Sequence, residues 1–257
     1  MANGVDIDMR GRIALVTGGG YGMGRASAIR FATAGAHVVV ADIDADNGKK
    51  TVAVIAELGG EAQFVEADVA EPANVERLLG DIEKDHGRLD YAHNNAGVLG
   101  ANLPIPDLPL DQWYWSLANN LTSVFLCMKY EIPLMKKSGG GAIVNVTSES
   151  LFKGNVADAA YTAGKHGVKG LTEVAGLAHI ADGIRVNAVA PGNVETGITE
   201  RGRLYDPARI QWAEQVQPIG RFGRSEEIAE LVVWLCSDAA SLINATVVAA
   251  DSGWHVA

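Results

Sequence analysis

The chain has 257 residues, of which 48% are hydrophobic, and its 21 basic and 31 acidic residues give a formal net charge of −10. This charge repels phosphate backbones and anionic lipid surfaces, so we expect neither a nucleic acid nor a membrane as a partner. No apolar stretch reaches the ~20 residues of a membrane span, and the polar start of the chain lacks the apolar core of a signal peptide, so we expect a cytoplasmic protein.

Short β-branched apolar runs alternate with stretches of helical length along the whole chain. The predicted strands cover residues 13–16, 37–41, 62–66, 89–93, 142–146, 184–190 and 246–250. The predicted helices between them cover residues 23–34, 47–58, 74–86, 110–137, 159–181 and 226–237. Continuous apolar strands separated by helices are typical of a parallel sheet covered on both faces. The sequence therefore predicts a doubly wound α/β fold with a seven-stranded parallel sheet, in one domain over residues 1–257.

Two segments interrupt this alternation. Residues 98–109 contain three prolines and predict an ordered loop. Residues 192–223 are too long for a simple connection and mix charged residues with apolar ones. Loops of that length often close over ligands, so we expect a substrate lid at about residues 196–217 that is less rigid than the sheet.

The first predicted strand ends in a glycine-rich turn, and a predicted helix follows at once. Residues 17–24 read Thr-Gly-Gly-Gly-Tyr-Gly-Met-Gly. Glycines allow the backbone to approach a pyrophosphate closely, and the helix N-terminus offers unpaired N–H groups to it. Asp42 ends the second predicted strand, where a carboxylate can accept hydrogen bonds from ribose hydroxyls but repels a 2′-phosphate. The pattern predicts a dinucleotide site that takes NAD.

The ends of the third and fourth predicted strands carry further candidate residues. Asp68 and Val69 follow the third strand, and Asn94-Asn95-Ala96-Gly97 follows the fourth. Ligands of doubly wound sheets bind outside the carboxyl ends of the strands. We therefore expect both segments to lie along the path of the adenine and ribose.

Tyr161 and Lys165 stand four residues apart on a predicted helix, thirteen and seventeen residues after Ser148. Residues i and i+4 project from one face of a helix, so the lysine ammonium can lie beside the phenol. A neighbouring cation favours phenolate and lowers its pKa from about 10. The pair suits general acid and base catalysis on an alcohol or a ketone.

In their order and spacing, these motifs resemble those of the short-chain dehydrogenase/reductase family, with its Rossmann-type fold, over nearly the whole chain. The resemblance implies an NAD-dependent oxidoreductase that interconverts a secondary alcohol and a ketone. Its catalytic residues are expected to be Asn120, Ser148, Tyr161 and Lys165. Its cofactor-binding residues are expected to be Gly18, Tyr21, Gly22, Met23, Gly24, Asp42, Ile43, Asp68, Val69, Asn95, Ala96, Gly97, Tyr161, Lys165, Pro191, Gly192, Val194 and Thr196.

The resemblance also implies a role for each catalytic residue. Tyr161 exchanges the hydroxyl proton, and Lys165 lowers the pKa of the phenol and holds the nicotinamide ribose. Ser148 bonds the substrate oxygen, and Asn120 positions a water near the lysine. Thr196 is expected to bond the nicotinamide carboxamide.

The substrate is expected to be a small alcohol or ketone, non-polar or cyclic. This expectation depends on apolar residues of the two loops, namely Leu99, Leu103, Leu151, Phe152 and Trp212. The helices predicted at 110–137 and 159–181 have apolar residues on more than one face, and relatives pair these helices, so we expect a homo-oligomer, a dimer or tetramer. The two cysteines and six histidines show no metal-ligand spacing, so no metal is expected.

The chain departs from the family pattern at three places. Thr147 stands where many relatives carry a second serine, Glu149 and Ser150 follow Ser148 where small apolar residues are usual, and Asp251-Ser-Gly replaces a common Asp-Gly-Gly. Two interpretations of Glu149 are open: it faces the substrate, or it is a solvated turn residue paired with Lys153, and we favour the second.

Two alternative functions are weighed against this one. The first is an NADPH-dependent reductase of 3-oxoacyl groups on acyl carrier protein. Such reductases usually carry an arginine where this chain has Leu177, and a net charge of −10 repels an acidic carrier. The second is a non-catalytic dinucleotide-binding regulator, which does not account for the four catalytic residue types together.

Overall fold

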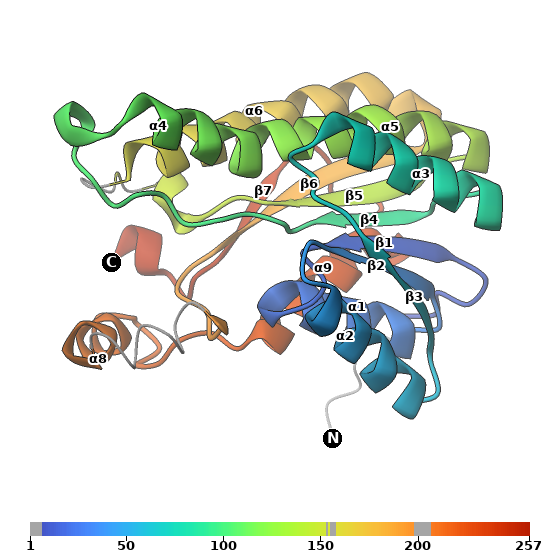
Figure 1. Ribbon diagram of the computed structural model, residues 1–257. Coiled ribbons are helices and arrows are strands. Elements are labelled where there is room, and N and C mark those ends of the chain that lie inside the picture. The colour runs from blue at the N-terminus through green and yellow to red at the C-terminus, as the bar shows by residue number, and fades with distance from the viewer. Residues whose placement is uncertain (1–6, 153, 155–157, 198–206) are drawn as a thin grey trace.

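The computed structural model describes residues 7–152, 154, 158–197 and 207–257. Its centre is a seven-stranded parallel sheet with the strand order β3-β2-β1-β4-β5-β6-β7 (Figure 1). The strands are β1 (Ile13–Thr17), β2 (His37–Asp42), β3 (Glu61–Glu66), β4 (Tyr91–Asn94), β5 (Gly141–Val146), β6 (Ile184–Pro191) and β7 (Val247–Ala250). The order reverses after β1, which confirms the predicted doubly wound sheet.

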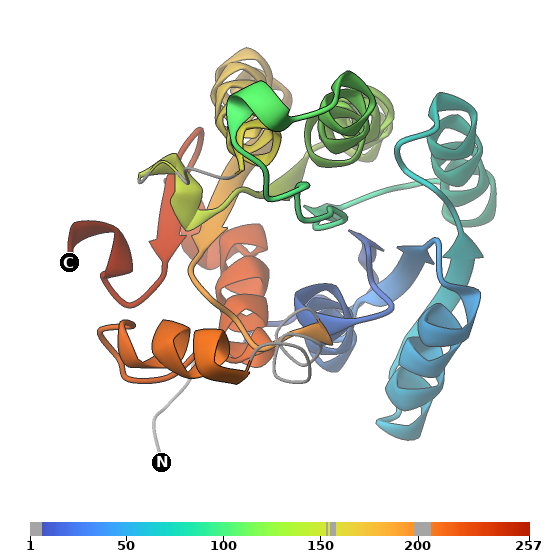
Figure 2. The same cartoon turned by 60° about the vertical axis from the view of Figure 1, so that its left-hand side comes forward.

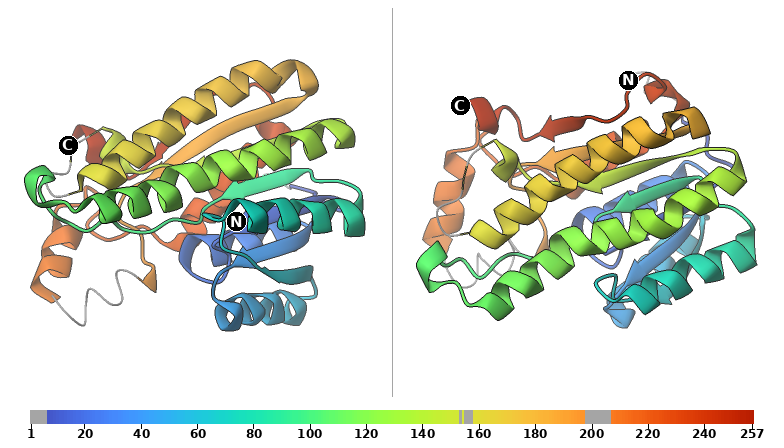
Figure 3. Two further views of the ribbon diagram at one scale, coloured as in Figure 1. Left: turned by 45° about the horizontal axis from the view of Figure 1, so that its top comes forward. Right: turned by 90° about the horizontal axis from the view of Figure 1, so that it is seen from above.

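Helices cover both faces of the sheet. They are α1 (Gly22–Thr33), α2 (Ala45–Glu57), α3 (Pro72–His86), α4 (Leu110–Leu117), α5 (Ser123–Ser138), α6 (Ala159–His179), α8 (Pro207–Gln215) and α9 (Ser225–Cys236). In Figure 1, α3, α5 and α6 lie on one side of the sheet, and α1, α2 and α9 lie on the other. Figure 3 shows α8 and the starts of α4 and α6 at the same end of the molecule as the last residues of the chain.

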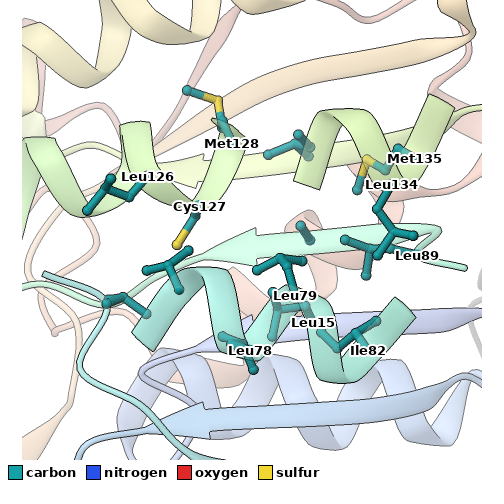
Figure 4. Close-up of a cluster of buried hydrophobic side chains, with 14 of the residues drawn as sticks. Leu15, Leu78, Leu79, Ile82, Leu89, Leu126, Cys127, Met128, Leu134 and Met135 are labelled. Atoms are coloured by element: carbon teal, nitrogen blue, oxygen red, sulfur yellow. The ribbon is translucent and has the colours of Figure 1, made fainter. Parts of the chain in front are cut away.

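The alternation of side chains along β1 divides the core between the two faces. Leu15 points into the cluster formed with α3 and α5, whereas Ala14 and Val16 point into the cluster formed with α1 and α9. Figure 4 shows Leu15 among leucine and isoleucine side chains of α3 and side chains of α5. Burial of both strand faces explains why the strands read as continuous apolar runs.

The helix predicted at 110–137 is two helices joined by a π-helical turn over Ala118–Thr122. The prediction of one regular α-helix is wrong there. A π turn adds one residue to the helical repeat, and no glycine or proline in this segment indicates it. The turn contains Asn120, one of the predicted catalytic residues. Helix α5 continues through Pro133.

Cys127 and Cys236 are buried free thiols. Burial raises the pKa of both, to about 12 for Cys236. Across the described ranges, no three histidine, cysteine or acidic side chains form a group that could hold a metal ion. None of the described helices combines the length and the apolar content that a bilayer span requires.

Candidate active site

A cleft of about 1210 Å³ runs along the carboxyl ends of the strands. Most of the predicted site residues line it: Gly18, Tyr21, Gly22, Met23, Asp42, Ile43, Asp68, Val69, Asn95, Ala96, Gly97, Ser148, Tyr161, Gly192, Val194 and Thr196. The other four, Gly24, Asn120, Lys165 and Pro191, are buried next to it. Chain segments far apart in the sequence therefore meet at one edge of the sheet, as Figure 2 shows for the ends of β1, β4 and β6.

The glycine-rich turn at one end of the cleft depends on glycine for its conformation and its packing. Gly18 and Gly22 have φ angles of 60° and 53°, in the left-handed region. A Cβ atom on Gly24 would lie 2.0 Å from the carbonyl oxygen of Gly18. The Asn95 amide braces the turn, because its Nδ2 donates to the carbonyl oxygens of Thr17 and Gly18, at 3.1 Å each.

The Asp42 carboxylate is held beside this turn. Its Oδ2 accepts from the Gly20 amide at 2.8 Å, and its Oδ1 accepts from the Asp44 amide at 2.9 Å. Asp68 accepts from the Ala70 amide at 2.9 Å and so shapes the turn after β3. No lysine or arginine is among the described residues that line the cleft. The glycine-rich turn and the start of α1 fit a dinucleotide whose pyrophosphate lies at the helix N-terminus. The fixed Asp42 carboxylate fits a ribose of the same dinucleotide.

The segment after β6 forms the wall opposite the glycine turn. Pro191 is the last residue of β6, and Gly192 and Val194 follow it along the cleft. Thr196 lies against the glycine turn, because a Cβ atom on Gly22 would be 3.1 Å from the Thr196 Cγ2 atom. This contact brings the segment after β6 against the start of α1.

Ser148 and Tyr161 both line the cleft. Ser148 follows β5 and is 8% exposed, and Tyr161 is in the first turn of α6. Burial raises the pKa of Tyr161 to about 12, the neighbouring Ser148 hydroxyl opposes this rise, and the nearby Asp158 and Glu149 carboxylates add to it. The prediction of a lowered phenol pKa is therefore wrong for this structure, since loss of solvation is the largest effect.

Lys165 lies behind the phenol. Its Nζ donates to the Val146 carbonyl oxygen at 2.9 Å and is 5.5 Å from the centroid of the Tyr161 ring. The residue is 3% exposed, and burial lowers the pKa of its ammonium to about 8. At neutral pH the ammonium remains largely protonated, so its charge is close enough to stabilise a phenolate that forms during reaction.

Asn120 is fully buried beside the lysine. Its Oδ1 accepts from the Val98 amide at 3.1 Å, and its Nδ2 donates to the Ser116 carbonyl oxygen at 3.0 Å. A Cβ atom on Gly97 would lie 2.9 Å from the Asn120 Oδ1 and 3.5 Å from the Lys165 Nζ. The three residues thus converge, and the asparagine fixes the backbone that follows β4.

Two carboxylates, Asp158 and Glu149, line the cleft near Tyr161. The sequence interpretation did not single out Asp158, and it favoured a solvated Glu149 over one that faces the substrate. Asp158 occupies the N-cap position of α6 without a capping hydrogen bond from its side chain, and burial raises its pKa. Its Oδ1 is buried without a hydrogen-bond partner. Glu149 also lines the cleft, while Lys153, its expected partner, lies outside the described residues. The one available signal was the position of Asp158, three residues before Tyr161 and directly before the predicted helix.

The predicted lid is described only in part. Ile210, Trp212 and Ala213 of α8 line the cleft, and residues 198–206 lie outside the described ranges. Of the apolar residues expected in the pocket, Leu99 and Trp212 line it. Leu103, Leu151 and Phe152 do not. The lining near Tyr161 and α8 therefore includes both apolar side chains and carboxylates.

Comparison with known proteins gives matches over nearly the whole chain. A family profile described as enoyl-(acyl carrier protein) reductase matches residues 18–255. The chain is 40% identical over 248 residues to 2,5-dichloro-2,5-cyclohexadiene-1,4-diol dehydrogenase of Sphingobium indicum, covering 96% of this chain and 98% of that one. It is 38% identical to cyclohexanol dehydrogenase of an Acinetobacter species, covering 95% of this chain and 94% of that one. A crystal structure from Agrobacterium tumefaciens, described as a 2-deoxy-D-gluconate 3-dehydrogenase with bound NADP, is 34% identical with a TM-score of 0.90, covering 98% of this chain and 100% of that one.

Proposed function

The chain belongs to the short-chain dehydrogenase/reductase family, and from this premise we propose that it is an NAD-dependent enzyme that interconverts a cyclic secondary alcohol and its ketone. One observation carries the proposal. Ser148 and Tyr161 line the same cleft as the glycine-rich turn, with the Lys165 ammonium behind the phenol ring. That arrangement places a proton-transfer group within the reach of a dinucleotide held by the turn.

Each catalytic residue has a separate role in the reaction. Ser148 hydrogen-bonds the substrate oxygen and holds it beside the Tyr161 phenol. In the reduction direction the phenol donates its proton to the ketone oxygen, and its raised pKa keeps it protonated at neutral pH. In the oxidation direction the phenolate takes the hydroxyl proton, and the Lys165 charge stabilises it. The glycine-rich turn and Asp42 would hold a nicotinamide cofactor, which would supply the hydride chemistry in either direction.

The preference for NAD depends on Asp42. Its carboxylate is fixed by two backbone amides beside the glycine-rich turn, where it would accept hydrogen bonds from a ribose and would repel a 2′-phosphate. The structure with bound NADP, which is 34% identical to this chain, argues against a preference for NAD. The activity of this protein with NAD and with NADP must therefore be compared directly. We expect kcat/KM to favour NAD by at least about tenfold, or ~1.4 kcal/mol. Equal values would refute the assignment.

A cyclic substrate is supported by the relatives that act on cyclohexanol and on a cyclohexadiene diol. The walls of the cleft suit a ring, since Leu99 and Trp212 offer apolar contact on one side. The acyl carrier alternative is less well supported, because Leu177 is an apolar side chain that is 73% exposed where a cation would be needed. NADH formation with cyclohexanol, linear secondary alcohols and a hydroxyacyl thioester tests the choice. Higher kcat/KM for the linear alcohols or the thioester would overturn it.

A further inference from the structure

The turn after β7 contains an unusual backbone conformation. Ser252 has a φ angle of 58°, in the left-handed region where non-glycine residues pay a steric cost. The neighbouring Asp251 is 5% exposed and holds the turn through its carboxylate. Its Oδ1 accepts from the Gly253 amide at 3.0 Å, and its Oδ2 accepts from the His255 amide at 2.9 Å. Strained conformations persist where the surroundings fix them, and they mark places where a chain needs a specific direction.

The turn directs the His255 ring toward the segment that follows Ser148. The ring nitrogen Nδ1 lies 2.7 Å from the Asp251 Oδ2, and the ring contacts the Phe152 ring in a tilted arrangement, with 4.5 Å between centroids and 36° between the planes. Phe152 ends a short 3-10 turn, in which its amide donates to the Glu149 carbonyl oxygen at 2.9 Å. Glu149 and Ser150 of that turn line the cleft. The histidine therefore contacts the residue that fixes this wall.

The same turn also contacts the opposite wall. The Gly192 amide donates to the Ala250 carbonyl oxygen at 3.2 Å. A Cβ atom on Gly192 would lie 2.9 Å from the Asp251 Cβ, so the two residues are packed closely. Gly192 itself lines the cleft. One turn thus joins the segment after β5 to the segment after β6.

We propose that His255 is a positioning residue that, with Asp251 and Phe152, fixes the distance between these two walls and so determines which ring substrates the cleft accepts. The reference to ring substrates rests on the proposed function, whereas the link between the turn and residues 149–152 does not. The histidine does not line the cleft, so its effect on substrate passes through Phe152.

Amide hydrogen exchange tests the link without any activity. In His255→Ala, the amides of residues 149–152 should exchange about three- to tenfold faster than in the wild type. This is the change expected from the loss of the contact between the His255 and Phe152 rings. Val256→Ala is the matched control, because Val256 is the next residue and is 78% exposed. It should leave that exchange unchanged. Equal exchange in the wild type and His255→Ala would overturn the proposal.

Steady-state kinetics tests the consequence for substrates, with cyclohexanol and 4-tert-butylcyclohexanol as probes. His255→Ala and Phe152→Ala should each change the ratio of kcat/KM between the two alcohols by about three- to tenfold, mainly through KM. Phe152→Tyr, which keeps the ring, should restore the wild-type ratio, and the affinity for NADH should stay within about twofold throughout. An unchanged ratio, or a parallel loss of NADH affinity, would overturn the proposal. A wild type inactive on both alcohols would overturn the proposed function, while the exchange result would still decide the link.

Discussion

Replacement of Lys165 should change how the stability of the protein depends on pH. The ammonium is 3% exposed, and burial lowers its pKa from 10.5 to about 8. Between these two values the unfolded chain binds more protons than the folded chain, so the stability of the wild type rises with pH across that window. The shift corresponds to ~3 kcal/mol, at about 1.4 kcal/mol for each pKa unit. The charged lysine thus costs stability at neutral pH.

Lys165→Met keeps the length of the side chain and removes the titration. The experiment measures urea unfolding of both proteins at matched protein concentration, from about pH 7 to about pH 10.5. The stability of the wild type should rise relative to the variant by ~3 kcal/mol over this range. At the lowest pH two effects on the stability of the variant oppose each other. The variant loses the hydrogen bond to the Val146 carbonyl, worth about 1.5–3 kcal/mol for a charged donor, and it gains stability because it buries no charge. A difference in stability that does not vary with pH would refute the reasoning.

The remaining predictions concern the site and the assembly. Tyr161→Phe should lose about 10²- to 10⁴-fold in turnover while NADH fluorescence titration gives an almost unchanged affinity, and a loss of affinity equal to the loss of turnover would contradict the role of the phenol. Asp42→Ala should narrow the preference for NAD over NADP in kcat/KM, because it removes the charge that repels a 2′-phosphate; an unchanged ratio would show that other residues select the cofactor. Exposed apolar side chains on α4, α5 and α6, which include Tyr114, Phe125 and Val174, should be covered in a homo-oligomer, a tetramer by the family resemblance. Light scattering at micromolar concentration would contradict this if it gave the mass of one chain.

The residues that could be predicted from sequence are those whose position follows from chain order and strand ends. Parallel strands place their carboxyl ends at one edge, so Asp42 and Ser148 reach the same cleft although they are distant in sequence. The glycine turn could be recognised because its positive φ angles require that residue type.

Other features depend on contacts that a sequence does not specify. The π turn over Ala118–Thr122 adds one residue to the helical repeat. The segment contains no glycine or proline, and its pattern of apolar residues does not indicate the turn. The pKa of Tyr161 depends on how far burial outweighs nearby charges, which requires coordinates. Asp158 and Glu149 line the cleft because of local turns around Tyr161, and a polar residue near a helix start usually reads as a cap.

The most direct test of the proposed function is the rate of NADH formation from NAD and cyclohexanol, measured for the wild type and for Tyr161→Phe. We predict a rate for the wild type that saturates with cyclohexanol, and a loss of about 10²-fold or more for the variant. The absence of cyclohexanol-dependent NADH formation by the wild type, or equal rates for the two proteins, would contradict the account.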